Sequence, residues 1–451
     1  MGKATIQRTG PRRGIGALAG LAALAAGPAL AADGGEESPD GGWGGDPWAQ
    51  EEQGGLPFDV SGFVELAGGY HTRDNKALDD DYNLAELRGR LEIRGNWQRL
   101  DYRVKADGVA DGVEDEVRGE LREARVSFPV GERLDMRAGR QVLTWGTGDL
   151  LFINDLFPKD WQSFLTGRDS EYLKAPSDAV RGMWYGDAVT LDVVWTPVFE
   201  PDVYPDGDRL SYFDTQRGQQ TARSVPTEDP DDLPDDGELA ARLSGRIGST
   251  ELAGYAYRGF FPRPGEQVSR DPLQLTHARL NAYGASVRDR LGPGIASAEV
   301  GYYDSVDYDS SRPMQAPNDE ARLLLGYDWE LVANLNVGFQ YYVEWLQDYD
   351  ELERAWARSP QEEAYRPEEY RDIITNRLTY SIWRDSLVWS LFTYYSPADE
   401  DYYARPSVHY RVSDELSYTL GGNLFGGEAS HTFYGQFERD SNIYGRIRYR
   451  F

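Results

Sequence analysis

The chain has 451 residues, a formal net charge of −29 and no cysteine. The negative charge argues against nucleic acid as a partner, because the phosphate backbone would be repelled. The lack of cysteine excludes structural disulfides, thiolate metal sites and a lipidated N-terminal cysteine. Beyond the N-terminus there is no long apolar run, so the sequence predicts no transmembrane helix.

Residues 1–31 predict a secretory signal peptide. A basic region ends at Arg13, residues 15–26 are small and apolar, and Ala29, Leu30 and Ala31 form an A-x-A cleavage site. Residues 32–58 are rich in glycine, proline and acid, which is typical of a flexible periplasmic leader. We therefore expect residues 59–451 to fold after export from the cytoplasm.

Residues 83–97 show the clearest strand pattern in the chain. Small and apolar side chains at odd positions alternate with a charged row, Glu86, Arg88, Arg90, Glu92 and Arg94. A strand turns successive side chains to opposite faces, so this segment has one apolar face and one fully charged face. The pattern favours the wet inner wall of a membrane barrel over the solvent face of a soluble sheet.

Similar segments recur to the end of the chain, and short connections alternate with long ones, as in bacterial outer-membrane barrels. The sequence therefore predicts an all-β fold, a transmembrane antiparallel up-and-down β-barrel of about 18 strands. The strands are expected near residues 59–70, 83–97, 98–109, 118–129, 132–142, 178–187, 188–198, 237–248, 250–261, 277–289, 294–304, 319–331, 334–346, 371–382, 385–396, 402–412, 414–426 and 442–451.

The last strand, residues 442–451, supports the same architecture. Arg446, Arg448 and Arg450 occupy its even positions, while Tyr449 and Phe451 end its apolar face. This ending resembles the C-terminal strand by which bacterial outer-membrane barrels are recognised during assembly. The resemblance implies that the barrel-assembly machinery binds the chain through Tyr449 and Phe451. It also implies a location in the cell outer membrane of a Gram-negative bacterium.

The charged faces of the strands predict which side chains line the pore. The expected pore-lining residues are Arg88, Arg90, Arg94, Arg103, Lys105, Arg137, Arg446, Arg448 and Arg450. Two interpretations stay open. In the first, the cations form a patch that attracts anions. In the second, a ladder of ion pairs neutralises them, with Glu86, Glu92, Asp101 and Asp107 in the same rows.

A long segment, residues 139–176, follows the fifth expected strand and is too apolar for an exposed loop. We expect it to fold into the barrel as a constriction loop that narrows the pore. Its candidate residues are Trp145, Asn154, Asp155, Lys159, Asp160, Trp161, Arg168 and Asp169. The alternative is that it packs only on the barrel rim or on a neighbouring subunit. Whether residues 143–177 block or only narrow the lumen is open.

Gly139, Arg140, Gln141, Trp145 and Gly146 form a G-R-Q-x-x-x-W-G motif, and the chain ends in Y-x-R-x-R-Y-x-F. Together with the inserted loop, these motifs resemble proteobacterial porin-like outer-membrane β-barrels of an uncharacterised type near the alginate-export porins. The resemblance implies an arginine-rich lumen that passes an acidic polysaccharide. The acid-rich loop at residues 200–238 departs from that pattern, so the solute stays open.

These features predict an outer-membrane porin, a channel for passive diffusion of small hydrophilic solutes, with anions among them. No G-x-S-x-G motif is present, and neither enzyme activity nor a cofactor is expected. The histidines, His71, His277, His409 and His431, lie in separate elements, so no metal site is expected. The acidic loop clusters are interpreted as solvated rather than as calcium sites.

Two other functions stay open. The apolar side chains of the inserted loop also suit a transporter of hydrophobic compounds, with Trp145, Phe152, Phe157 and Trp161 as the binding residues. The barrel could instead be a scaffold for another envelope protein, docked on residues 32–58 and 200–238. Outer-membrane lipid, lipopolysaccharide and a small solute are the expected partners, and the sequence leaves a homo-oligomer open.

Overall fold

The structure of the protein is a computed structural model that describes residues 58–232, 235–270, 273–312, 314–358 and 363–451. The expected signal peptide and residues 32–57 of the expected leader lie outside these ranges, so both stay predictions. Within the described ranges, no helix is long and apolar enough to cross a membrane.

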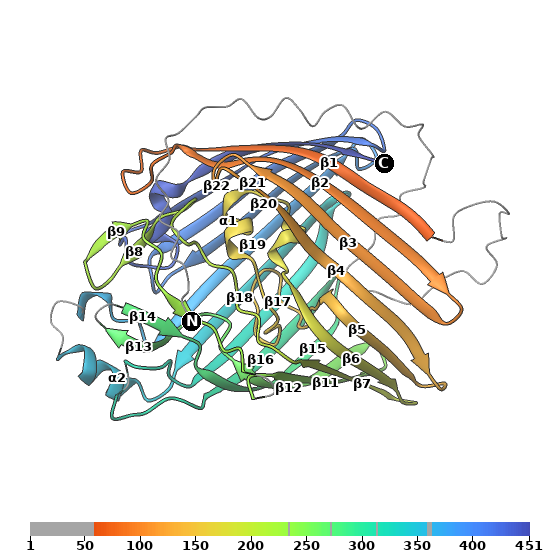
Figure 1. Cartoon of the computed structure of the whole chain (residues 1–451). Helices are drawn as coiled ribbons and strands as arrows, with labels where there is room; N and C mark the ends of the chain where they lie inside the picture. The colour runs from red at the N-terminus through yellow and green to blue at the C-terminus, as the bar shows by residue number, and fades with distance from the viewer. Residues whose placement is uncertain (1–57, 233–234, 271–272, 313, 359–362) are drawn as a thin grey trace, which may run out of the picture. The chain divides into compact units, whose positions relative to one another are not determined.

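One antiparallel sheet of 18 strands closes on itself, because β1 pairs with both β2 and β23. Each strand pairs with the next barrel strand along the chain, and Figure 1 shows them tilted around a common axis. The expected up-and-down barrel and its strand number are confirmed. The strands are β1 (Phe58–His71), β2 (Tyr82–Trp97), β3 (Leu100–Asp111), β4 (Glu116–Val130), β5 (Leu134–Val142), β6 (Pro176–Tyr185), β7 (Val189–Thr196), β11 (Glu238–Ile247), β12 (Thr250–Phe260), β15 (Arg279–Leu291), β16 (Gly294–Ser305), β17 (Glu320–Val332), β18 (Leu335–Leu346), β19 (Tyr370–Ile382), β20 (Leu387–Ser396), β21 (Asp401–Arg411), β22 (Leu416–Gly427) and β23 (Asn442–Arg450).

The connections divide the barrel into a short-turn end and a long-loop end. β1 begins and β23 stops at the short-turn end, where left-handed residues such as Gly248, Gly292 and Asn334 close tight turns. All remaining elements lie in the long-loop connections. These are α1 (Trp161–Thr166), η1 (Ser170–Leu173), β8 (Tyr212–Asp214), β9 (Gln219–Thr221), β10 (Thr227–Glu228), β13 (Glu266–Arg270), β14 (Leu273–Thr276), α2 (Tyr349–Trp356), η2 (Glu363–Tyr365) and η3 (Gly435–Asp440).

The outward face of the barrel is apolar. Side chains such as Leu243, Leu325 and Ile447 alternate with inward-facing polar residues along their strands and are exposed. Exposed aromatic side chains form two rims. The rim at the long-loop end includes Tyr82, Trp195, Tyr283 and Tyr370, and the rim at the short-turn end includes Trp97, Trp184, Trp383 and Trp389. An apolar belt between two aromatic rims is the surface that a lipid bilayer requires of a barrel.

The hydrophobic core lies inside the barrel rather than between two sheets. Its buried residues come from inward-facing wall side chains such as Tyr303 and Tyr403, from the connection between β5 and β6, and from other long-loop connections, which add residues such as Leu210 and Tyr434. Figure 1 shows α1, which belongs to that connection, within the ring of strands. The lumen is therefore partly filled by the protein's own chain.

Leu243 and Ser244 test the assignment of the two faces, because they are neighbours on β11. Leu243 is 51% exposed on the outward face, whereas Ser244 faces inward. We expect Leu243→Arg to lower the free energy of unfolding by about 2–4 kcal/mol, since a charge would enter the lipid. Ser244→Arg, the matched control, should lower it by less than half as much. Urea titration in lipid vesicles measures both, and equal losses would contradict the assignment.

Candidate functional site

The inserted segment, residues 143–175, leaves β5 and returns to β6 through the lumen. Its side chains Ile153, Phe164 and Leu165 are buried against the barrel wall. An isolated bridge between Lys159 and Lys174 joins its outgoing and returning halves. The apolar residues that mark this segment in the sequence are therefore a packed core, which explains why it does not stay in water.

The helix α1 occupies the middle of the inserted segment. Asp160 caps it, and its carboxylate accepts a 2.7 Å hydrogen bond from the Ser163 N–H. Gly167 ends it in the left-handed region with φ of 96°. A Cβ atom at Gly167 would collide with the ring of Tyr444 on β23, so both conformation and space require glycine there.

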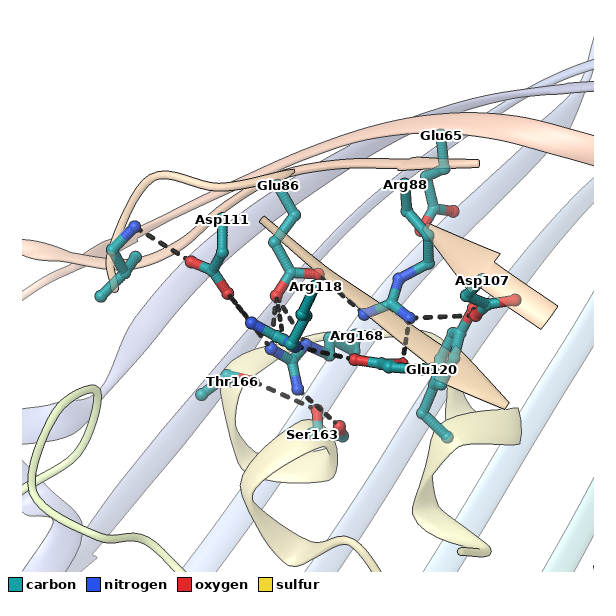
Figure 2. A network of polar contacts seen from close by, with 12 residues as sticks. Glu65, Glu86, Arg88, Asp107, Asp111, Arg118, Glu120, Ser163, Thr166 and Arg168 are labelled. Atoms are coloured by element: carbon teal, nitrogen blue, oxygen red, sulfur yellow. Dashed lines mark hydrogen bonds and ion pairs between the residues drawn. The ribbon is translucent and has the colours of Figure 1, made fainter. Parts of the chain in front are cut away.

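A buried network of charges attaches α1 to the wall formed by β2, β3 and β4. Arg168 donates to Glu86 at 2.8 Å and to the Ser163 hydroxyl at 2.9 Å. Arg88, which is 2% exposed, donates to Glu86 at 3.2 Å and to Asp107 at 3.0 Å. Figure 2 shows these side chains converging between the strands and α1. Burial is tolerated because each ion has an opposite partner.

A second connection contributes to the same network. Arg209, in the connection between β7 and β11, is fully buried and pairs with Asp111 on the wall. Its Nε atom also donates to Glu114 at 2.8 Å. Arg118 on β4 binds Asp111 at 3.0 Å. The acid-rich loop of residues 200–238 therefore places a buried cation, Arg209, against the inner wall of the barrel.

The residues after α1 bind the wall on both sides of the β1–β23 seam. The Asp169 carboxylate pairs with Arg446 at 2.8 Å and Arg448 at 3.0 Å. Glu171 pairs with Arg90 at 2.7 Å. The seam that closes the barrel is thus also a main attachment of the inserted segment.

The first half of the segment contacts the opposite wall, formed by β16 to β20. The Glu299 carboxylate accepts hydrogen bonds from the Thr147 N–H at 2.6 Å and the Asn154 N–H at 2.9 Å. Asp149 pairs with Arg377 at 2.9 Å. Because these strands lie across the barrel from β1 to β4, the segment crosses the whole lumen.

Most of the predicted constriction residues form contacts with the barrel wall, with another connection or within the segment itself. Trp145 donates to Asp192 at 3.1 Å, and Trp161 donates to Asp202 at 2.9 Å. Lys159, which is 2% exposed, donates to Asp155 at 3.1 Å. Asn154, Asp155, Lys159 and Arg168 are all buried. The structure therefore brings the predicted residues together, but their side chains hold the segment in place.

All the predicted pore-lining residues occupy inward-facing positions of the wall. Most have carboxylate partners: besides the pairs described above, Arg94 and Arg103 contact Glu92, and Lys105 contacts Glu123 at 3.1 Å. The ladder of ion pairs thus accounts for seven of the nine predicted cations, namely Arg88, Arg90, Arg94, Arg103, Lys105, Arg446 and Arg448.

Arg137 and Arg450 differ from the other predicted cations. Within the described ranges, neither side chain has a hydrogen bond or an ion pair. Arg137 lies directly opposite Arg181 in the register of β5 and β6, and its Nε atom is shielded from water without a partner. Arg181 is itself held by Asp192 at 2.6 Å. Like charges in such a pair repel each other.

Several functional candidates were missed by sequence reasoning. Arg122, Arg125, Arg181, Arg242 and Arg377 also face inward. Their strands have less regular charge alternation than β2, so periodicity alone gave a weak signal. Phe433, Tyr434 and Phe437, in the connection before β23, also pack into the lumen core. Three closely spaced aromatic residues could have indicated a second buried loop.

Open space remains on the short-turn side of the segment. A cavity of about 690 Å³ lies between β12 and β19, with Arg288, Asp328 and Arg377 among its lining residues. By contrast, the cavity beside Trp145 and Phe157 measures about 10 Å³, room for at most one water molecule. Over the described parts of the chain, no group of side chains is arranged to hold a metal ion.

Comparisons with known proteins identify the fold. A scan against protein-family models and a search of curated proteins found no match. Among solved structures, Acinetobacter baumannii OccAB3 has a TM-score of 0.52 and 8% identity over 87% of this chain and 99% of that chain. OccAB4 of the same organism has a TM-score of 0.51 and 10% identity over 88% of this chain and 98% of that chain.

The outer membrane channel DcaP of Acinetobacter baumannii is also similar, with a TM-score of 0.42, 12% identity, and 87% and 97% of the two chains covered. The architecture of this chain is thus that of the 18-strand outer-membrane porin barrels. The resemblance to the alginate-export type stays a prediction.

The pair of Arg168 and Glu86 offers a test of the segment's attachment. Removing Arg168 leaves Glu86 less compensated, so Arg168→Met should lower the local opening free energy of residues 160–175 by about 3–5 kcal/mol. Hydrogen exchange of those amides measures the effect. The double variant with Glu86→Gln should recover part of the protection. Unchanged exchange in the single variant would show that the pair does not hold the segment.

Asp440 makes the packing of the long loops depend on pH. It is fully buried at the end of η3, and accepts hydrogen bonds from Asn75 at 2.7 Å and the Ser211 hydroxyl at 3.0 Å. Burial without a cationic partner raises the pKa of Asp440 from 3.8 to about 7. The packed state therefore holds a proton that the open state releases, and its stability falls as pH rises from about 4 through 7.

We therefore expect residues 205–221 to lose protection between pH 5 and pH 8, because Ser211 belongs to this cluster. Hydrogen exchange, corrected for its intrinsic pH dependence, measures this change. Asp440→Asn mimics the protonated carboxyl and should flatten the profile. The same pH profile in that variant would assign the effect to another group.

Proposed function

We propose that the chain is an outer-membrane porin of a Gram-negative bacterium, which passes small hydrophilic solutes and prefers anions. The observation that carries the proposal is a closed barrel with a charged lumen that one inserted segment crosses. A barrel of this strand number is wide enough for a water-filled channel. The segment, residues 143–175, would then set the size of solute that passes.

The anion preference rests on cations without partners. Arg137 and Arg450 face the lumen, and neither forms an ion pair with a carboxylate among the described residues. A low-dielectric wall focuses the field of such charges and raises the local concentration of anions. The acid-rich loops outside would oppose this effect. The charge selectivity of the pore therefore depends on the balance between the lumen arginines and the loop acids, and it has to be measured on the intact protein.

The packing of the segment argues against a transporter of hydrophobic compounds. The ring centroids of Trp145 and Phe157 are 5.0 Å apart in an edge-to-face contact, and the cavity beside them has a volume of about 10 Å³. An apolar ligand would find no room there without displacing the core. We also propose that the barrel-assembly machinery recognises Tyr449 and Phe451 and that several barrels associate in the membrane.

Deleting residues 147–172 tests the channel function. Thr144 and Lys174 are neighbours, with a 2.8 Å hydrogen bond between their side chains, so a short linker can join the ends. In planar bilayers the intact protein should conduct weakly. The deletion should conduct several-fold more, because the crossing segment is gone. A barrel that inserts in both forms but conducts in neither would exclude a porin.

Arg137 and Arg450 provide the test of anion preference. Reversal potentials in a salt gradient should favour anions for the intact protein, and the variant Arg137→Gln with Arg450→Gln should shift them toward zero. Arg384→Gln is the control, because this exposed arginine lies in the turn between β19 and β20. Cation preference of the intact protein would mean that the acidic loops control permeation.

A further inference from the structure

The outward face of the barrel carries very few charges. Along the described barrel strands, alternation leaves only three outward-facing cations, Arg140, Arg258 and Arg279. All three are close to the long-loop end of their strands. Because a charge on the lipid-facing side is costly, each of these needs a partner or a polar surrounding.

The chain supplies carboxylate partners for only one of the three cations. Arg140 on β5 pairs with Asp178 at 3.2 Å and with Glu200 at 2.8 Å. Arg258 and Arg279 are exposed, and among the described residues neither side chain forms a hydrogen bond or an ion pair. The two exceptions are neighbours in space, which points to a common cause.

The register of β12 and β15 brings the two arginines together. Arg258 pairs with Asn281 and Phe260 pairs with Arg279, so the arginines are diagonal neighbours on adjacent strands. Diagonal neighbours lie about 7–8 Å apart at the backbone, within reach of one ligand for two long side chains. A phosphate group fits between two guanidinium groups because each can donate two parallel hydrogen bonds.

Their depth agrees with a lipid headgroup as the ligand. Tyr283 and Tyr302 are paired partners one step nearer the middle of the barrel, and both are exposed. Such aromatic side chains lie at the boundary between acyl chains and headgroups. Arg258 and Arg279 therefore lie at headgroup level, where long cationic side chains can reach phosphate.

The acids near the two arginines form no ion pair with either side chain among the described residues. Glu266, the first residue of β13, is close enough to Arg279 that the guanidinium partly opposes the burial that raises the pKa of its carboxyl. Asp304 accepts a 3.0 Å hydrogen bond from Asn281, and Asp307 accepts a 2.6 Å hydrogen bond from the backbone N–H of Arg279. These carboxylates flank the pair on the β16 side. They would disfavour a ligand that extends its negative charge in that direction.

We propose that Arg258 and Arg279 bind a phosphate of a phosphorylated glycolipid in the outer leaflet. The inference rests on the outer-membrane location proposed above, in which the long-loop end faces outward. The outer leaflet of that membrane consists mainly of lipid with phosphorylated sugar headgroups, so this is the anion at hand. The site goes beyond solute passage, since it lies on the opposite side of the wall from the lumen.

The test uses the full-length protein in phosphatidylcholine nanodiscs, with diphosphoryl lipid A as the probe and its dephosphorylated form as the comparison. The variant Arg258→Gln with Arg279→Gln should bind diphosphoryl lipid A at least about tenfold more weakly, because two charge-assisted contacts are lost. Each single substitution should have an intermediate effect. Arg384→Gln, at the other end of the barrel, should bind like the intact protein.

Three results separate this site from its alternatives. Equal binding by the intact protein and the double variant would overturn the proposal, as would equal affinity for phosphatidylglycerol and diphosphoryl lipid A. Partial recovery with Arg258→Lys and Arg279→Lys would support a phosphate site. Lipid binding is measured without ion flow, so the result is independent of the conductance that tests the porin function.

Discussion

The contact between Glu86 and Arg168 illustrates the constraint on which the rest of the structure depends. Inward-facing positions of β2, β3 and β4 are charged, and any protein that fills the lumen must bury those charges. Burial of an unpaired ion costs several kcal/mol, at least about 3–5 when a partner is missing. The connections that fill the lumen therefore have to supply the opposite charges. Arg168 and Arg209 meet wall carboxylates, while Asp169 and Glu171 meet wall arginines.

The inserted segment is held by different kinds of contact at its two ends. Near the seam the contacts are ion pairs whose arginines are buried, while the Asp169 and Glu171 side chains are 26% and 36% exposed. Dissolved salt screens such pairs less than pairs in which both side chains are exposed. On the β16 to β20 wall the segment relies on backbone groups bound by Glu299 and on aromatic packing. Its ion pair there, Asp149 with Arg377, is partly exposed, with side chains 42% and 35% exposed. Salt therefore weakens this end more than the seam end.

Much of the fold could be predicted because a strand repeats every two residues. The alternation in β2 identified both faces, and the apolar content of residues 139–176 identified the segment that enters the lumen. The ion-pair partner of each charged side chain could not be predicted. Arg88 binds Asp107 on β3 and Glu120 on β4, and this choice depends on strand register. Arg209 was hidden in an acid-rich loop, because its buried role depends on a contact with Asp111 on a distant strand.

The cost of burying an unpaired charge also determines which wall cations can attract a solute. A wall arginine that already has a buried carboxylate gains little from a passing anion, because the anion must compete with a fixed, desolvated partner. Arg88 and Arg90 belong to this group, although their sequence pattern suggested pore-lining residues. Arg137 faces the same lumen, but its cross-strand neighbour is another arginine. Asp192, which pairs with Arg181, relieves part of the repulsion between the two arginines. An anion from solution would relieve the rest, so selectivity for anions would arise at the unpaired Arg137 rather than in the most regular charged row.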